Sequence, residues 1–272
     1  MCTDIHDQIT FAEQLEKMVE ERTKELHRSN EDLQQFVHVA SHDLKEPLRK
    51  IIFFAGRMQD DLKEQLDENG RFYLSRISIA ANRMVLMING VLKYATVSSL
   101  DEIYEPVDLN EVVKNVLFDL DLAIQQKEAT IHCTLLPQIE GASVMLQQVF
   151  YNLISNSLKF ARTGIPPVIT ISSETIDRDG KTFARIKLKD NGIGFEQIYA
   201  EKIFGTFTRL HSKDKYEGAG LGLSLCKKII ERHCGSIKAK SAENIGTIFE
   251  ILLPFHPSHT FESSNEYKEH RF

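Results

Sequence analysis

The sequence predicts a long antiparallel helical hairpin followed by a mixed α/β domain. Residues 11–98 contain one Pro and three Gly, and their apolar residues recur at spacings of three and four, as on one face of a helix. From about residue 106, short runs that alternate polar and apolar residues are mixed with helical patterns and Gly-rich turns, which is typical of α/β domains. With 272 residues, the chain is long enough for two domains.

The composition excludes several classes of protein. The net charge is −6, from 33 Lys and Arg against 39 Asp and Glu, which is the wrong sign for a protein that binds the nucleic-acid backbone. No apolar run approaches the roughly 18 residues that a membrane-spanning helix needs. The cysteines form no CxxC pair and are scattered, at Cys2, Cys133, Cys226 and Cys234. We therefore expect no nucleic-acid partner, no membrane span in this chain, and the reduced thiols of a cytoplasmic protein.

The first helix carries a heptad pattern. Apolar residues fall every seven positions, at Val19, Leu26, Leu33 and Ala40. The companion positions include the polar residues Arg22 and Ser29, so the pattern predicts a weak coiled coil over residues 11–38. After Ala40 the apolar seam steps by four residues twice, which straightens a coiled coil into a bundle and indicates a second segment over residues 39–98.

A turn and a second apolar stripe complete the hairpin. The polar segment 63–71 contains Gly70 and predicts the turn. The second stripe consists of Leu74, Ile77, Ala81, Met84, Ile88, Val91 and Ala95. Two helices alone cannot bury both stripes, so we expect a homodimer through residues 11–98 that forms a four-helix bundle. A long monomeric hairpin is the alternative, and it would leave the stripes exposed.

The second domain, residues 106–255, is predicted element by element. Asp108 is a candidate N-cap for a helix that extends to Leu120. The later elements are a strand at 130–136, a helix at 142–161, paired strands at 168–176 and 182–189, a Gly-punctuated loop at 190–220, a helix up to Cys234 that Gly235 terminates, and strands at 236–241 and 246–254. Residues 256–272 are predicted to form a mobile polar tail.

His42 is the candidate nucleophile of the first helix. It lies two residues from Ala40 and two from Leu44, about 200° round the helix from each, so it is expected to point away from the seam into solvent. A neutral imidazole in that position is a competent nucleophile, and Asp43 beside it can accept its proton or select its tautomer. Taken alone, an exposed His-Asp pair is usually only part of a solvated face.

Asn152, Asn156 and Lys159 share one stripe of the predicted helix at 142–161, about 60° wide. The stripe lies beside the apolar arc that is expected to face a sheet. Asn oxygens are ligands for a hard cation, and a Lys ammonium is suited to phosphate. The alternative is a surface stripe in which the two Asn residues merely weaken the helix.

Two Gly clusters flank the loop at 190–220. The first, DNGIG at 190–194, follows a predicted strand, so the Asp190 carboxylate can accept from an adenine amino group while the glycines let the backbone approach a ligand; a plain β-turn is the alternative. The second, GAGLGL at 218–223, opens the next helix, whose free N–H groups are suited to phosphate. The residues between the clusters predict a mobile lid with basic side chains.

The order of these motifs resembles that of a sensor histidine kinase. SHDLKEPL at 41–48 resembles the phosphoacceptor box of a HisKA-like dimerisation domain, in the variant found among phytochrome-like kinases. QVFYNLISNSLKF at 148–160, IFGTF at 203–207, the two Gly clusters and Gly246-Thr247 resemble the boxes of a GHKL-type ATP-binding domain, which is a two-layer α/β sandwich. The resemblance covers roughly residues 10–255.

The resemblance implies phosphoryl transfer from ATP to His42, with Asp43 assisting, and then onward to an aspartate of a response-regulator receiver domain. Asn156 would hold Mg²⁺, and Asp190 would recognise adenine. The implied nucleotide contacts are Asn152, Asn156, Lys159, Asp190, Gly192, Gly194, Phe204, Phe207, Arg209, Gly218, Gly220, Leu221, Gly222, Leu223 and Thr247.

Two other functions remain as alternatives within this resemblance. A gyrase-like or chaperone-like ATPase would carry a Glu base one turn before the metal-binding Asn, where this chain has Asn152. A scaffold that only binds nucleotide would not need His42. Glu46 stands where many HisKA members carry the Thr or Asn that positions a water for dephosphorylation, which leaves phosphatase activity open. Ser157 stands where Ala is commoner, and this small-for-small change is expected to have little consequence.

The opening residues carry a shorter resemblance. Cys2-Thr3-Asp4-Ile5, with Gln8, is similar to the final strand of a PAS sensor domain. We therefore expect residues 1–10 to be the remnant of an upstream sensor domain, and residues 96–106 to be the hinge between the two parts of the chain.

Overall fold

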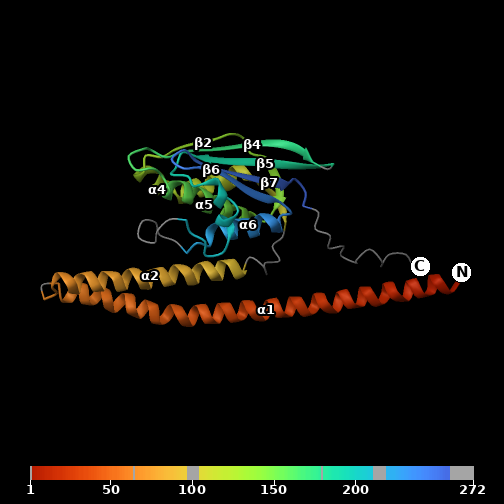
Figure 1. Ribbon diagram of the computed structural model, residues 1–272, viewed down its shortest axis with the longest axis horizontal. Helices are drawn as coiled ribbons and strands as arrows, with labels where there is room; N and C mark the ends of the chain where they lie inside the picture. The colour runs from red at the N-terminus through yellow and green to blue at the C-terminus, as the bar shows by residue number, and fades with distance from the viewer. Residues whose placement is uncertain (1, 64, 97–103, 179, 211–218, 258–272) are drawn as a thin grey trace. The chain divides into compact units, whose positions relative to one another are not determined.

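The computed structural model describes residues 2–63, 65–96, 104–178, 180–210 and 219–257 (Figure 1). The chain divides into two compact units, Met1–Asp101 and Glu102–Phe272. The first unit is helical and the second contains all the strands that the structure describes, so the predicted fold class is confirmed. The expected hinge at 96–106 and the expected C-terminal tail lie largely outside the described residues.

Two antiparallel helices make up the first unit: α1 (Cys2–Asp61) and α2 (Glu68–Thr96) (Figure 1). The turn between them lies in the predicted segment. Asp67 precedes α2, and its Oδ1 accepts from the backbone N–H of Gly70 at 2.7 Å. This bond satisfies one of the free N–H groups in the first turn of α2, which explains why the helix begins there.

The core of the hairpin is narrow. Among the hairpin residues whose side chains the structure describes, those buried are Ser41, Leu48, Ala55, Leu74 and Ala81. The large apolar side chains that remain more than 40% exposed include Leu33, Phe36, Val39, Leu44, Ile51, Phe53, Phe54, Met58, Ile77 and Met84. One copy of the hairpin therefore leaves large apolar side chains of both predicted stripes exposed to solvent, among them Ile51 and Met58 of α1 and Ile77 and Met84 of α2.

Residues 2–5 do not form a strand in this structure, and the expectation that residues 1–10 are the remnant of an upstream sensor domain stays a prediction. Helix α1 already includes Cys2, so residues 2–5 are helical and continuous with the heptad segment. The physical reason is that a strand needs a neighbour for its backbone N–H and C=O groups, whereas a helix satisfies them within its own segment.

The second unit is a two-layer α/β sandwich. Its main sheet has the order β2 (Thr130–Cys133), β4 (Val168–Arg178), β5 (Lys181–Asp190), β7 (Gly246–Pro254) and β6 (Ser236–Ala242). Strands β2 and β4 are parallel, and the other neighbouring pairs are antiparallel. A separate antiparallel pair joins β1 (Glu105–Asp108) to β3 (Gln138–Gly141).

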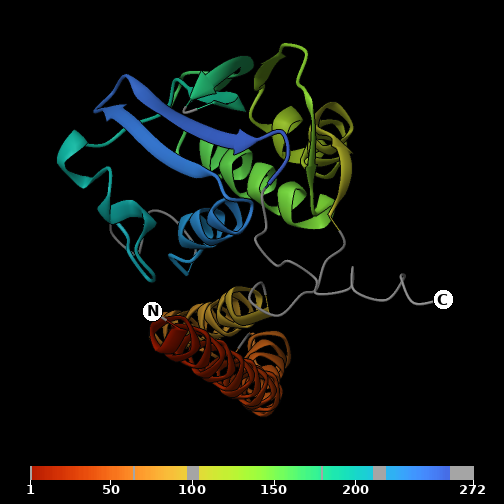
Figure 2. The same ribbon diagram turned by 90° about the vertical axis from the view of Figure 1, so that its right-hand side faces the viewer.

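Helices cover one face of the main sheet (Figures 1 and 2). They are α3 (Leu109–Asp119), α4 (Asp121–Gln126), α5 (Ser143–Lys159) and α6 (Gly222–Arg232), with short 3₁₀ turns at Gln197–Tyr199 and Lys202–Phe204. Asp108 caps α3 as predicted, since its side chain accepts from the backbone N–H of Asn110. Along β5 every second residue is buried against the helices, and Leu153 and Ile154 of α5 are fully buried opposite them. This apolar layer fixes α5 and the end of β5 relative to each other.

Sequence reasoning placed the end of α6 wrongly. The helix ends at Arg232, and Cys234 rather than a glycine takes the left-handed conformation, with φ of 55°. The N–H groups of Cys234 and Gly235 donate to the carbonyls of Glu231 and Ile230, which is a Schellman cap. Gly235 has a different role: a Cβ there would collide with the Leu252 carbonyl of β7.

Candidate active site

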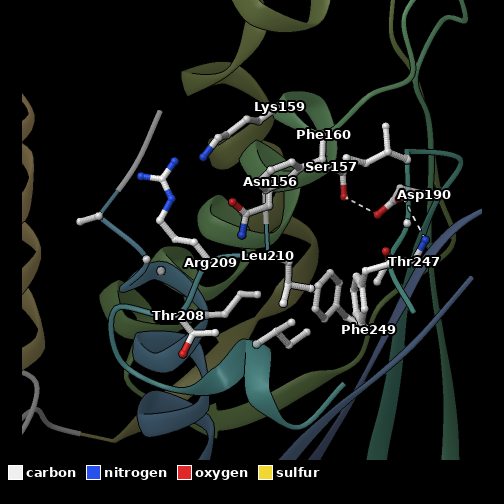
Figure 3. A pocket seen from close by; sticks show the side chains of 18 residues that line it. Asn156, Ser157, Lys159, Phe160, Asp190, Thr208, Arg209, Leu210, Thr247 and Phe249 are labelled. Carbon is white, nitrogen blue, oxygen red and sulfur yellow. Dashed lines mark hydrogen bonds between the residues drawn. The ribbon is translucent and has the colours of Figure 1, made fainter. Parts of the chain in front are cut away.

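A cavity of about 280 Å³ opens in the second unit between α5, the end of β5, β7 and the beginning of α6 (Figure 3). Its lining includes nine of the predicted contacts: Asn156, Lys159, Asp190, Gly194, Arg209, Gly220, Gly222, Leu223 and Thr247. The fold therefore gathers residues from four separate sequence motifs around one hollow. The apolar part of the lining, which includes Ile193, Phe195, Ile203, Leu210 and Phe249, was not predicted.

Asp190 forms the carboxylate end of the cavity and is only 8% exposed. Its Oδ1 accepts from the backbone N–H of Gly192 at 2.9 Å and from that of Thr247 at 3.1 Å. Its Oδ2 accepts from the Ser157 hydroxyl at 3.1 Å. Burial raises the pKa of this carboxyl above its ordinary value of 3.8, and the three donors partly oppose that shift. The acceptor that remains on Oδ2 is suited to an amino group of a bound base.

Asn156, Lys159 and Arg209 form the polar and cationic part of the lining, away from Asp190 (Figure 3). Asn156 and Lys159 come from the last turns of α5, and the Lys159 Nζ lies 4.7 Å from the centre of the Phe160 ring. An elongated ligand with a base at one end and phosphates at the other matches this separation of a carboxylate from two cations.

Asn152 does not line the cavity. Its Nδ2 donates to the carbonyl of Gly222 at 3.3 Å, and its Oδ1 accepts from Gln148 at 3.0 Å. Cys226 of α6 is fully buried nearby, and burial raises the pKa of its thiol to about 12. Asn152 therefore ties α5 to the first turn of α6, while its role as a direct nucleotide contact stays a prediction.

Of four further predicted contacts, three do not line the cavity and one lies outside the residues that the structure describes. Phe204 is buried and packs edge-on against Phe249, which does line the cavity, while Phe207 is 56% exposed. Leu221 is buried at the N-terminus of α6. Gly218 lies outside the described residues.

The glycines permit close approaches of backbone segments. A Cβ on Gly192 would lie 2.7 Å from the carbonyl oxygen of Phe160, at the end of α5. Gly220 has φ of 74°, and a Cβ there would lie 2.9 Å from the carbonyl of Thr208. Gly192 thus acts through its N–H bond to Asp190 rather than as part of the lining, and Gly220 lets the loop beside Phe207 lie against the start of α6.

Sequence reasoning missed Arg162. Its Nε donates to the carbonyl of Asn191 at 2.8 Å and its Nη1 to the carbonyl of Asn244 at 2.9 Å. The N–H of Asn244 in turn donates to the carbonyl of Ile193. One guanidinium therefore clamps the loop after Asp190 to the β6–β7 turn. An Arg two residues after the 148–160 motif carried no periodic signal that could have indicated this.

His42 lies in the other unit, on α1. Its side chain is 78% exposed, as predicted, and its Nδ1 lies 3.3 Å from Oδ1 of Asp43. Glu46, one turn further on, forms an ion pair with Lys50 at 2.9 Å, and this pairing lowers the pKa of the Glu46 carboxyl. The imidazole is thus exposed on the surface of helix α1.

Comparison with known families agrees with both units. The model of the His Kinase A (phospho-acceptor) domain matches residues 32–99, and the model of the histidine kinase-, DNA gyrase B- and HSP90-like ATPases matches residues 141–257. The two matched domains, in this order, are those of a histidine kinase, and the chain belongs to that family.

The relatives point to a phytochrome-like subgroup. The chain is 35% identical over 231 residues to the phytochrome-like protein Cph1 of Synechocystis sp., covering 85% of this chain and 30% of that protein. It is 36% identical over 233 residues to cyanobacterial phytochrome B of Nostoc sp., covering 84% of this chain and 30% of that protein. The chain thus spans about a third of the length of these curated relatives.

Solved structures support the fold. Full-length ShkA in complex with AMPPNP matches with a TM-score of 0.59 and 22% identity, covering 81% of this chain and 46% of that one. The Acinetobacter baumannii histidine kinase AdeS matches with a TM-score of 0.52 and 22% identity, covering 77% of this chain and 97% of that one. In the part of the chain that the structure describes, no helix is both long and apolar enough to cross a membrane.

Proposed function

We propose that this chain is an ATP-dependent protein histidine kinase that phosphorylates its own His42 and passes the phosphoryl group to an aspartate of a response-regulator receiver domain. The observation that carries the proposal is the exposed His42–Asp43 pair inside the matched phosphoacceptor domain. The same chain contains a cavity with a carboxylate at one end, suited to a base, and two cations at the other, suited to phosphates. Neither feature alone identifies the reaction.

The base end of the proposed ATP site works through Asp190. Its Oδ1 is occupied by two backbone donors, so Oδ2 is left to accept from the amino group of adenine. The apolar side chains of the lining, Phe249 among them, would cover the adenine ring. Lys159 and Arg209 then offset phosphate charge, and because little covalent chemistry is needed, positioning and charge neutralisation dominate the rate.

The lining also fits a magnesium ion held with the nucleotide. Across the described residues, no cluster of three or more His, Cys, Asp and Glu side chains could hold a metal by itself. The Asn156 amide lines the cavity on the phosphate side of Asp190 (Figure 3). One protein oxygen together with phosphate oxygens is a usual way to bind Mg²⁺. When bound there, the ion would neutralise charge that develops on the phosphates during transfer.

Asp43 favours one tautomer of His42, because a carboxylate can only accept and Nδ1 lies 3.3 Å from its Oδ1. In the tautomer with the proton on Nδ1 the lone pair is on Nε2, which makes Nε2 the proposed nucleophile. The new bond joins Nε2 to the γ-phosphorus, and the bond that breaks joins that phosphorus to the oxygen of departing ADP. The proton on Nδ1 can then move to Asp43, which is an exposed carboxylate.

The partners follow from the same proposal. A second copy of the chain would cover the exposed apolar stripes of α1 and α2, giving a homodimer through residues 11–98. The receiver domain would reach His42 from solvent, and an upstream sensor domain would act through α1. A cytoplasmic location would supply ATP to the site and keep the thiols of Cys133, Cys226 and Cys234, which are free cysteines, reduced.

A hydrolytic ATPase is the competing function. Asn152 occupies the position of the water-activating Glu in that class, and its amide is engaged with Gly222 and Gln148. An amide cannot act as a base, and this one also holds α6 in place, which favours transfer to His42 over hydrolysis.

Incubation with γ-labelled ATP tests the proposal. We expect label on the protein that is labile in acid and stable in base, as a phosphoramidate is, and that moves to an added receiver domain. Release of labelled phosphate with no label on the protein would support the ATPase. Nucleotide binding without either reaction would support a scaffold.

A further inference from the structure

We propose that Ser157 is a positioning residue for base recognition, whose hydroxyl holds Oδ2 of Asp190 as the acceptor for the exocyclic amino group of adenine. The inference rests on the proposed binding of ATP in this cavity. It concerns the position in the 148–160 motif where the chain departs from the commoner Ala.

The Ser157 side chain is buried and lies within hydrogen-bond distance of Asp190. The side chain is 3% exposed on α5, and its Oγ lies 3.1 Å from Oδ2 of Asp190 and 3.2 Å from the carbonyl of Leu153. A hydroxyl has one proton, so it donates to one of these acceptors at a time. Ser and Thr inside helices often donate back to the carbonyl four residues earlier, so the Asp190 contact is the unusual one.

The contact matters because it involves the Asp190 oxygen that is proposed to accept from adenine. Oδ1 is fixed by the N–H groups of Gly192 and Thr247, so the plane of the carboxylate is set by two backbone segments. Ser157 is the donor to the other oxygen among the described residues, and it comes from a third element, α5. With three donors in place, one lone pair of Oδ2 remains directed into the cavity that both residues line.

Loss of the hydroxyl would weaken this arrangement in two ways. Oδ2 would lose its donor in a buried place, which leaves this oxygen unsatisfied or lets it recruit a water. The ionised form would also be less favoured, because burial already raises the pKa of Asp190 and Ser157 is one of the groups that lowers it. A protonated carboxyl would present a donor to the amino group, which is itself a donor.

The test is a double-mutant cycle between the Ser157 hydroxyl and the amino group of the ligand. The full chain and its Ser157→Ala variant are titrated calorimetrically with ADP and with its 6-deamino analogue, purine riboside diphosphate. Ser155→Ala is the matched control, because Ser155 lies on the same helix and outside the cavity lining. Since Ala is the commoner residue at position 157 in the family, the variant is expected to fold.

We expect Ser157→Ala to weaken the affinity for ADP about five- to tenfold and the affinity for the deamino analogue less than twofold. The ratio of the two affinities should therefore become smaller. Ser155→Ala should leave both affinities unchanged. An equal loss for both ligands would show that Ser157 only maintains the shape of the cavity, and no loss for either would show that it is a filler; both results overturn the inference. Failure of the parent chain to bind ADP would instead remove the proposed function on which the inference rests.

Discussion

The backbone N–H of Thr247 donates to Oδ1 of Asp190 at 3.1 Å, although the two residues are 57 positions apart in the sequence. The bond joins the beginning of β7 to the end of β5 at the point where the proposed base site begins. The carboxylate is therefore held in place by the backbone of the neighbouring strand. The first two predictions below depend on this end of the cavity or on the segments that hold it.

Acidification should weaken nucleotide binding through Asp190. Burial raises its pKa, and the ionised form is the one that accepts from adenine, so ADP affinity should fall as the pH drops through a range above 3.8. Acidification has the opposite effect on stability. Because the pKa of Asp190 is higher in the folded than in the unfolded state, its ionisation lowers the free energy of unfolding. This destabilisation disappears as the pH falls through the folded-state pKa. Calorimetric ADP titrations between pH 7 and pH 4 measure the effect. An affinity that stays constant for the parent chain down to pH 4, while the fold remains intact, would contradict this role.

Removing Arg162 should weaken the site without touching the ligand. Arg162→Ala loses both hydrogen bonds that clamp the loop after Asp190 to the β6–β7 turn, and we expect ADP affinity to fall about three- to tenfold. Arg162→Lys keeps the charge but not the forked geometry, so it should recover only part of the loss. Lys114→Ala removes an exposed surface cation that pairs with Glu111, and it serves as the control. Equal affinities for the parent and Arg162→Ala would exclude the clamp.

Asn156→Ala should remove the effect of Mg²⁺ on nucleotide binding and leave recognition of the adenine base intact. We expect ADP affinity in the absence of Mg²⁺ to change less than twofold, because Asp190 and the apolar lining are unaltered. The gain in affinity that Mg²⁺ confers on the parent should be lost, and labelling of the protein should fall at least a hundredfold. A variant that still responds to Mg²⁺ like the parent would remove Asn156 from the metal site.

The oligomeric state should depend on the hairpin. The full chain should sediment as a dimer at micromolar concentration, because the exposed apolar stripes of α1 and α2 need a partner. A fragment of residues 104–272 should be monomeric and still bind ADP; it begins at Tyr104 because that hydroxyl donates to the Arg232 carbonyl and β1 follows directly. Analytical ultracentrifugation of both chains decides the matter. A monomeric full chain or a dimeric fragment would place the interface elsewhere.

Local patterns in the sequence predicted much of this molecule. The hairpin and its turn follow from helical periodicity, and α3, α5 and the β4–β5 pair follow from a cap, an amphipathic stripe and alternation. Strands β1 and β3 were not predicted, because each has only four residues and they pair with each other across α3 and β2. Strand β2 is equally short, but it lies within the longer alternating run at 130–136, and neither β1 nor β3 was recognised as part of such a run.

The residues of the cavity lining were indicated where chemistry and motif coincide and missed where contacts are long-range. Asp190, Asn156 and Lys159, which line the cavity, were selected from their residue types and spacing. The bond from Ser157 to Asp190 spans 33 residues, and the Arg162 bond to Asn244 spans 82. Both depend on how α5 packs on the sheet, which no local pattern encodes. The same holds for Asn152, whose stripe position suggested a ligand contact but whose amide reaches Gly222.

Labelling of His42 variants tests the central claim most directly. His42→Gln retains a polar residue on an exposed surface, so the free energy of unfolding should change by no more than about 0.5 kcal/mol and ADP affinity should be unchanged. Asp43→Asn leaves the imidazole but removes the proton acceptor, so labelling should be slowed rather than lost. With γ-labelled ATP, the account predicts no acid-labile label on His42→Gln, slow labelling of Asp43→Asn and full labelling of the parent, at equal melting temperatures. Acid-labile phosphate on His42→Gln at the parent's rate would show that another histidine is the acceptor and would contradict the account.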